Sequence, residues 1–204
     1  MIIFGFSVFY IFGLIGTGQF HCPNCGGDRE YEHRTARRFF TLFFLPVIPL
    51  DKVGEVVRCR TCRVKFDPVV LQRPTSAQLA SALPAGMRAA VAVVLRAGGV
   101  SEPASRAAIE AVRRAGAADY GFEQLHADLA QPAETAAGPL QTLAGQLVPE
   151  ARERYLAEAV RIALTDGPLS PAERDAAHWI GSRLGMTQAH AHGVISTVEQ
   201  SVRF

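Results

Sequence analysis

The pattern of hydrophobic positions changes near residues 72–76. Up to that point the apolar residues are mostly β-branched or aromatic and occur in short runs, which favours β-strands. From Ser76 onward Ala, Leu, Arg and Glu dominate, a composition that favours helices. The pattern predicts an α+β chain of two domains: a small β-rich domain over residues 1–73 and an all-helical domain over residues 78–204.

Two segments of the first part are strongly apolar. Residues 1–20 carry no charge, and as a helix Met1–Gly16 would be only about 24 Å long, shorter than a hydrocarbon core of ~30 Å. Buried strands are the preferred interpretation, while a membrane-touching segment and a signal peptide stay open. Residues 39–50 contain Pro46 and Pro49, which exclude a regular helix and indicate an extended core strand. The alternative for residues 39–50 is a wedge at a membrane surface, following Arg34, Arg37 and Arg38.

Seven helices are predicted in the second part from their Gly, Pro, Ser and Thr boundaries. They span residues 85–97, 102–115, 120–130, 134–147, 149–164, 171–184 and 188–202. In helix 149–164 the apolar residues recur at helical spacing and should face a core. These residues are Tyr155, Leu156, Ala159, Val160, Ala163 and Leu164.

The helical part also contains an internal repeat. Residues 90–116 and 159–185 are identical at nine of 27 aligned positions, including Gly98/Gly167 and Gly116/Gly185. Each copy reads as a helix, a turn with glycine, a serine N-cap and a second helix, so a duplicated helix pair is expected. In the second copy Ser170 and Glu173 form the pattern of a capping box.

Composition and charge exclude several classes of protein. The chain has 204 residues, 49% of them hydrophobic, and a net charge of +2, which argues against a disordered chain and against a surface built to bind nucleic acid. Residues 1–75 carry ten basic and six acidic side chains, whereas residues 76–204 carry eleven and thirteen. The sequence contains no nucleophile elbow, P-loop, dinucleotide-binding fingerprint or H-E-x-x-H motif, so the protein is expected not to be an enzyme.

All four cysteines belong to two C-x-x-C motifs, Cys22–Cys25 and Cys59–Cys62. Each motif lets one turn direct two sulfurs to one point, and two such turns supply the four ligands of a tetrahedral zinc ion. No cysteine is left to suggest an open catalytic position, so one structural Zn²⁺ is predicted. Two disulfides or an iron–sulfur cluster remain as alternatives. The 33 intervening residues must form a hairpin, with strands expected over residues 31–35 and 39–45 and a turn at 51–54.

The order of motifs resembles a known family. The segment FHCPNCGGD, the segment RRFFTLFFLPVIPL and the second C-x-x-C are similar to the bacterial zinc-ribbon family with an FFTLFFIPxIPL-type core strand. The resemblance covers about residues 1–70 and implies a small metal-stabilised module without catalysis. Animal membrane-associated zinc domains with an apolar insert are a looser comparison.

The helical part resembles a second family. Its segment DGPLSPAE, residues 166–173, looks like the DGxLSxxE pattern of TerB-like tellurite-resistance domains and of some DnaJ-type cochaperones. This resemblance implies a divalent-metal site at Asp166 and Glu173. The first copy of the repeat has Ala97 and Ala104 at the equivalent positions, so only the second copy carries the acidic residues of such a site.

These observations predict a cytoplasmic, stress-associated adaptor with a protein partner. A variant of this prediction adds peripheral membrane contact through residues 1–20 and 39–50. Nucleic-acid binding is the alternative from a different class, through Arg34, Arg37, Arg38, Arg58, Arg60 and Arg63. Acidic residues interleave with these arginines, which disfavours a polyanion as the partner.

Overall fold

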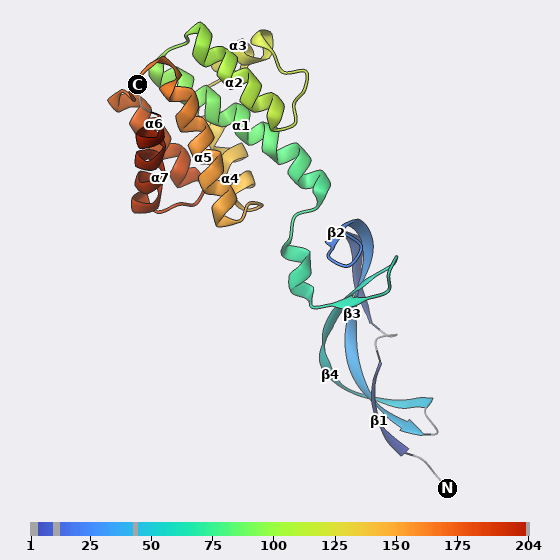
Figure 1. Cartoon of the computed structure of the whole chain (residues 1–204). Helices are drawn as coiled ribbons and strands as arrows, with labels where there is room; N and C mark the ends of the chain where they lie inside the picture. The colour runs from blue at the N-terminus through green and yellow to red at the C-terminus, as the bar shows by residue number, and fades with distance from the viewer. Residues whose placement is uncertain (1–3, 10–12, 43–44, 203–204) are drawn as a thin grey trace. The chain divides into compact units, whose positions relative to one another are not determined.

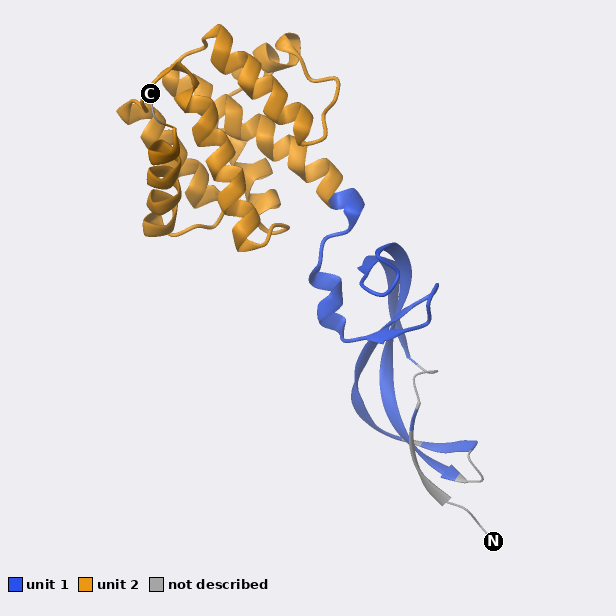
Figure 2. Cartoon of the chain, in the orientation of Figure 1, with its two compact units in different colours: residues 1–78 blue, residues 79–204 orange. Residues whose placement is uncertain are grey.

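The chain folds into a β-sheet unit followed by a helical unit (Figure 1). The computed structural model describes residues 4–9, 13–42 and 45–202. Residues 1–78 and 79–204 form separate compact units (Figure 2). This is the α+β architecture with two domains that the composition predicts.

The first unit is one antiparallel sheet built around the long strand β3. The strands are β1 (Phe4–Phe9), β2 (Leu14–Cys22), β3 (Gly27–Leu42), β4 (Leu45–Cys59) and β5 (Lys65–Phe66). β1 and β2 pair with successive parts of one edge of β3, β4 pairs with the other edge, and the short β5 pairs with β4. A 3₁₀ helix, η1 (Pro68–Gln72), follows the sheet.

The hairpin between the two cysteine motifs exists, but it turns at a different place from the predicted one. β3 and β4 pair from Tyr31↔Cys59 to Leu42↔Leu45, with bulges along the way. Residues 51–54 therefore lie inside β4, and the prediction of a turn there is wrong. Asp, Lys and Gly favour turns locally, but the ladder with β3 satisfies the backbone of this segment instead.

The sheet is packed at one end and open at the other. Near the cysteines the buried side chains are Phe20, Val57 and Val70, and the Phe20 ring makes edge contacts with Tyr31 and Phe66 at 5.6 and 5.9 Å between centroids. Further along, Phe39 is buried, but eight large apolar side chains are exposed. We call these eight the distal apolar surface: Val8, Leu14, Ile15, Leu45, Val47, Ile48, Leu50 and Val53.

The expectation that residues 1–20 form buried strands is therefore half right. Residues 4–9 and 14–22 are strands, but Val8, Leu14 and Ile15 are exposed. The sheet has no second layer over these positions among the described residues of the unit, so an apolar sequence here does not become core. Residues 1–3, 10–12 and 43–44 lie outside the described residues, although the strand predictions included them.

The helical unit has seven α-helices within its described residues, close to the predicted boundaries. They are α1 (Ser76–Gly98), α2 (Glu102–Arg114), α3 (Phe122–Ala130), α4 (Ala137–Ala144), α5 (Pro149–Ala163), α6 (Pro171–Arg183) and α7 (Gln188–Ser201). Short 3₁₀ segments, η2 (Ala133–Ala136) and η3 (Leu164–Asp166), precede α4 and follow α5. α1 begins nine residues before the predicted start, because it continues through Pro84.

One contiguous core holds the helices together. The predicted inner face of α5 is buried, from Tyr155 to Leu164, and Ile180 of α6 is buried beside it. The internal repeat corresponds to the pairs α1–α2 and α5–α6, whose second helices begin at the N-caps Ser101 and Ser170. In the first pair the left-handed residue of the glycine turn is Gly99, which follows Gly98.

The segment Pro68–Gly98 is the one described helical stretch that is long and apolar enough to cross a membrane. Half of its most apolar 18-residue window is buried inside the fold. A helix in the core of a folded domain can have the same length and the same apolar composition. α1 contributes Ala90, Val91 and Val94 to the helical core, which accounts for its apolar composition.

Gly181 marks a close contact between two helices and provides a test of the packing. A Cβ at Gly181 would lie 2.7 Å from the Cβ of Ala191 on α7, whereas a Cβ at Gly193 meets nothing within 4 Å. We expect Gly181→Ala to destabilise the helical unit by about 1 kcal/mol, since overpacking outweighs the better helix propensity of alanine. Gly193→Ala should stabilise it by up to about 1 kcal/mol.

Urea unfolding followed by the fluorescence of Trp179, the single tryptophan, measures both variants in the full chain. Equal stability of the two variants would contradict the assigned contact between α6 and α7.

Candidate metal centre

The two cysteine motifs lie at turns that end strands of the sheet. Cys22 ends β2 and Cys25 lies in the turn into β3, while Cys59 ends β4 and Cys62 lies in the turn toward β5. Because β2 and β4 pair with opposite edges of β3, the register brings both turns to the same end of the sheet. The hairpin thus joins two motifs that are far apart in the sequence.

Both turns have the same backbone form. The N–H of Gly26 donates to the carbonyl of Cys22 at 2.9 Å, and the N–H of Arg63 donates to that of Cys59 at 3.0 Å. Both residues are left-handed, with φ of +67° at Gly26 and +62° at Arg63. The sequence indicates this conformation only for the first turn, where glycine adopts it without strain. In the second turn an arginine adopts it, so the motif imposes the same geometry on both.

The four sulfurs converge on one point. One thiol sulfur from each of Cys22, Cys25, Cys59 and Cys62 lies within 4.8 Å of all the others. The Sγ atoms of Cys22 and Cys62 are 3.8 Å apart. Four sulfurs placed tetrahedrally at about 2.3 Å from one zinc ion are separated by about 3.8 Å. The donor set and the spacing therefore fit one structural zinc ion.

The remaining alternatives fit less well. All four cysteines are free, and a sulfur separation of 3.8 Å is far longer than a disulfide bond of about 2.05 Å. An iron–sulfur cluster places several metal atoms among its cysteines, whereas these sulfurs surround a single point.

The protonation of the thiols also calls for a cation. Burial raises the pKa of Cys22, and burial together with the neighbouring thiols raises the pKa of Cys25 to about 12. The backbone N–H of Val64 instead lowers the pKa of Cys62 to about 7. A divalent ion would displace the protons of Cys22 and Cys25, because the thiolate is the metal ligand.

Comparison with known proteins agrees with this geometry. Residues 20–73 match a zinc-ribbon family model. The match covers about a quarter of the chain, contains all four cysteines and ends before α1. No curated protein and no solved structure matches the chain. Residues 20–73 therefore form a structural, metal-stabilised module, and we call the unit that contains it, residues 1–78, the zinc ribbon.

The second predicted site has a different geometry. Glu173 accepts a hydrogen bond from the N–H of Ser170 at 2.8 Å, and Ser170 Oγ accepts one from the N–H of Glu173 at 3.2 Å. The predicted capping box is confirmed. A Cβ at Gly98 would meet Glu173 Oε1 at 2.1 Å, so the carboxylate lies against the end of α1. Asp166 is exposed in η3, and among the described residues the cysteines form the only group of three or more metal donors.

Several candidate arginines are engaged with acidic neighbours. Arg34 Nε lies 2.9 Å from Glu32 Oε2, and Arg60 Nη1 lies 2.7 Å from Glu30 Oε2. Arg38 is exposed on β3 opposite Val8 of β1. The basic side chains of the zinc ribbon therefore do not form one uninterrupted positive surface.

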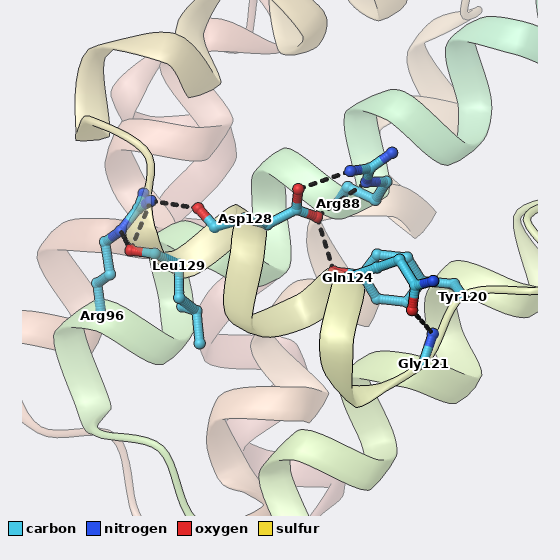
Figure 3. A network of polar contacts seen from close by, with 7 residues as sticks. All are labelled: Arg88, Arg96, Tyr120, Gly121, Gln124, Asp128 and Leu129. Atoms are coloured by element: carbon cyan, nitrogen blue, oxygen red, sulfur yellow. Dashed lines mark hydrogen bonds and ion pairs between the residues drawn. The ribbon is translucent and has the colours of Figure 1, made fainter.

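A polar network in the helical unit was not predicted from the sequence (Figure 3). The carboxylate of Asp128 is 8% exposed and receives Arg88 Nε at 2.8 Å and Arg88 Nη2 at 2.6 Å. The hydroxyl of Tyr120 donates to the same carboxylate at 2.8 Å, and the guanidinium of Arg88 lies 5.4 Å from the centre of the Tyr120 ring. Arg96 donates to the carbonyls of Asp128, Leu129 and Gln131 at the end of α3.

The network stabilises the ionised form of Asp128. Burial acts to raise the pKa of Asp128, but the hydrogen bonds from Arg88 and Tyr120 outweigh it and lower the pKa. Burial and the adjacent carboxylate raise the pKa of Tyr120, so its hydroxyl stays a donor. The sequence does contain a signal for this network, since Arg88 and Arg96 are the only charged residues among the 23 residues of α1.

Removal of one sulfur tests the metal centre. We expect Cys59→Ser to abolish stoichiometric zinc binding and to unfold the zinc ribbon, because few other buried side chains hold its two cysteine turns together. The helical unit should keep its fold, since its core is separate.

Elemental analysis of the purified protein measures zinc, and Trp179 fluorescence in urea reports on the helical unit of the same sample. One retained zinc per chain in the variant, or iron in the wild type, would contradict the assignment.

Proposed function

We propose that this protein is a non-catalytic, stress-associated adaptor of the cytoplasm, in which the zinc ribbon is structural and the helical unit binds a protein partner. The resemblance of residues 166–173 to the TerB-like pattern supports the connection with stress. A divalent-metal site at Asp166 and Glu173 belongs to the same hypothesis, but the capping role of Glu173 does not require it.

A groove in the helical unit carries this proposal. It lies between α5 and α7 and has a volume of about 490 Å³. Small or apolar residues line it: Ala157, Ala189, Gly193, Val194 and Val198. Arg154 and Arg161 also line it, together with the ion pair between His190 and Glu153 at 2.8 Å. Small side chains let a partner helix approach closely, and Arg154 favours an acidic one, whereas Arg161 is paired with Glu158 at 3.1 Å.

Photo-crosslinking tests the groove as the partner site. A photoreactive phenylalanine analogue at Thr197, in the groove, should give one defined protein adduct in cells stressed with tellurite or peroxide. The same analogue at Gln141, an exposed position on α4, is the matched control and should not give that adduct. Gly193→Trp should abolish the Thr197 adduct by filling the groove. Identical adducts at both positions would contradict the proposal.

The distal apolar surface favours a second candidate function, a membrane-peripheral protein. Leu45, Val47 and Ile48 are 68%, 55% and 51% exposed. Because consecutive residues of a strand point to opposite faces, both faces of this part of β4 are open. Arg38 and Lys52 are exposed on the adjoining parts of β3 and β4, where anionic lipid headgroups could meet them. Apolar patches of this kind mark interaction sites.

Liposome sedimentation separates this candidate from the adaptor alone. If the surface enters a membrane, wild-type protein should sediment with vesicles that contain phosphatidylglycerol. The double variant Val47→Asp/Ile48→Asp should then bind at least about tenfold more weakly. Val148→Asp, at a similarly exposed valine of the helical unit, is the control and should bind like the wild type. Equal weakening by both changes, or no sedimentation of the wild type, would exclude membrane binding through this surface.

Nucleic acid is not the partner that we propose. Glu30 and Glu32 pair with Arg60 and Arg34, and each such pair reduces the positive charge available to phosphates.

A further inference from the structure

The polar network of the helical unit borders a cavity that neither the zinc ribbon nor the α5–α7 groove includes. The cavity has a volume of about 200 Å³ and lies beside α1 and the end of α3. Ala85, Ala89 and Ala92 of α1 line it, together with Arg88, Arg96 and Asp128. All of these residues belong to the helical unit.

The charge at this cavity is not balanced. Arg88 is neutralised by Asp128, with which it makes two hydrogen bonds. Arg96 has no carboxylate partner within the described part of the chain; its bonds go to the carbonyls of residues 128, 129 and 131. Carbonyl groups at a helix end carry only partial negative charge, so one full positive charge remains beside the cavity.

The donors of Arg96 are also incompletely used. Its Nε and Nη2 make the bonds to the end of α3, whereas its Nη1 makes none to any described residue. Capping of α3 accounts for the first two nitrogens and leaves the third without a partner among the described residues, in a side chain that lines the cavity. The N–H groups of Nη1 can donate charge-assisted hydrogen bonds to a carboxylate or phosphate oxygen.

The lining also restricts the size and shape of a ligand. The three alanines of α1 leave an apolar wall, and Pro139 and Ala136 add further apolar surface. A ligand with a short aliphatic body would cover this wall while its anionic group meets Arg96. A volume of about 200 Å³ suits a ligand of a few heavy atoms.

We propose that this cavity binds a small organic anion, whose carboxylate or phosphate group pairs with Arg96 and whose aliphatic part lies on the alanines of α1. The ion pair of Arg88 and Asp128 also lines the cavity. This site is independent of the proposed adaptor function, because it shares no residue with the α5–α7 groove.

Titrations of the ¹⁵N-labelled full chain followed by NMR test the site. The probes are butyrate and inorganic phosphate at constant ionic strength, with butyramide as the neutral analogue of butyrate. We expect butyrate or phosphate to shift amide signals within residues 85–96 and 128–139, and the stronger of the two identifies the anionic group. Butyramide should cause much smaller shifts.

Three variants complete the test. Arg96→Gln should weaken binding at least about tenfold, as expected for the loss of a charge-assisted pair. Ala92→Met narrows the cavity but keeps both arginines, and it should also abolish anion binding. It therefore tests the cavity as the binding site even if Arg96→Gln does not fold. Arg106→Gln, at an exposed arginine on α2, is the control and should bind like the wild type. No shifts with either anion, equal shifts with butyramide, or unchanged binding by Ala92→Met would overturn the proposal.

Discussion

The convergence of four sulfurs on one point is the constraint on which the zinc ribbon depends. Among the residues that the structure describes, its buried core near the cysteines contains Phe20, Val57 and Val70 besides Cys22 and Cys59. So few apolar side chains cannot offset the conformational entropy of a five-stranded sheet, and a metal ion supplies the missing stabilisation. The two turns differ in sequence but share one backbone form, including a left-handed arginine at position 63. The metal-binding geometry therefore determines the local conformation even where the residue does not favour it.

The helical unit is stabilised in the opposite way. A contiguous core from all seven described helices buries more than thirty apolar side chains. Among the described residues of this unit, the one strongly buried charged side chain is Asp128, and its carboxylate is fully paired. The pairing links α1 to α3 across 40 residues of sequence. An unpaired carboxylate at this depth would be costly, so the network also makes the packing of these two helices specific.

Three surfaces remain without a partner inside the described chain: the groove between α5 and α7, the distal apolar surface and the cavity beside Arg96. They differ in chemistry, since the groove suits a helix, the distal surface suits a membrane or an apolar protein surface, and the cavity suits a small anion. The first and third lie in the helical unit and the second in the zinc ribbon. A metal-stabilised ribbon can carry exposed apolar residues at its far end, because its fold does not need them as core.

The sequence alone determined the two-domain α+β organisation, the metal ligands and nearly all helix boundaries. These features depend on local signals, namely the C-x-x-C spacing, glycine and proline positions and N-caps such as Ser170. Only the tertiary structure decided that residues 51–54 continue a strand, that Val8 and Leu14 are exposed, and that Arg88 meets Asp128. An apolar residue favours burial, but on a sheet it becomes buried only where a second layer covers it. Strand pairing, and an ion pair between distant residues, depend on which segments the fold brings together.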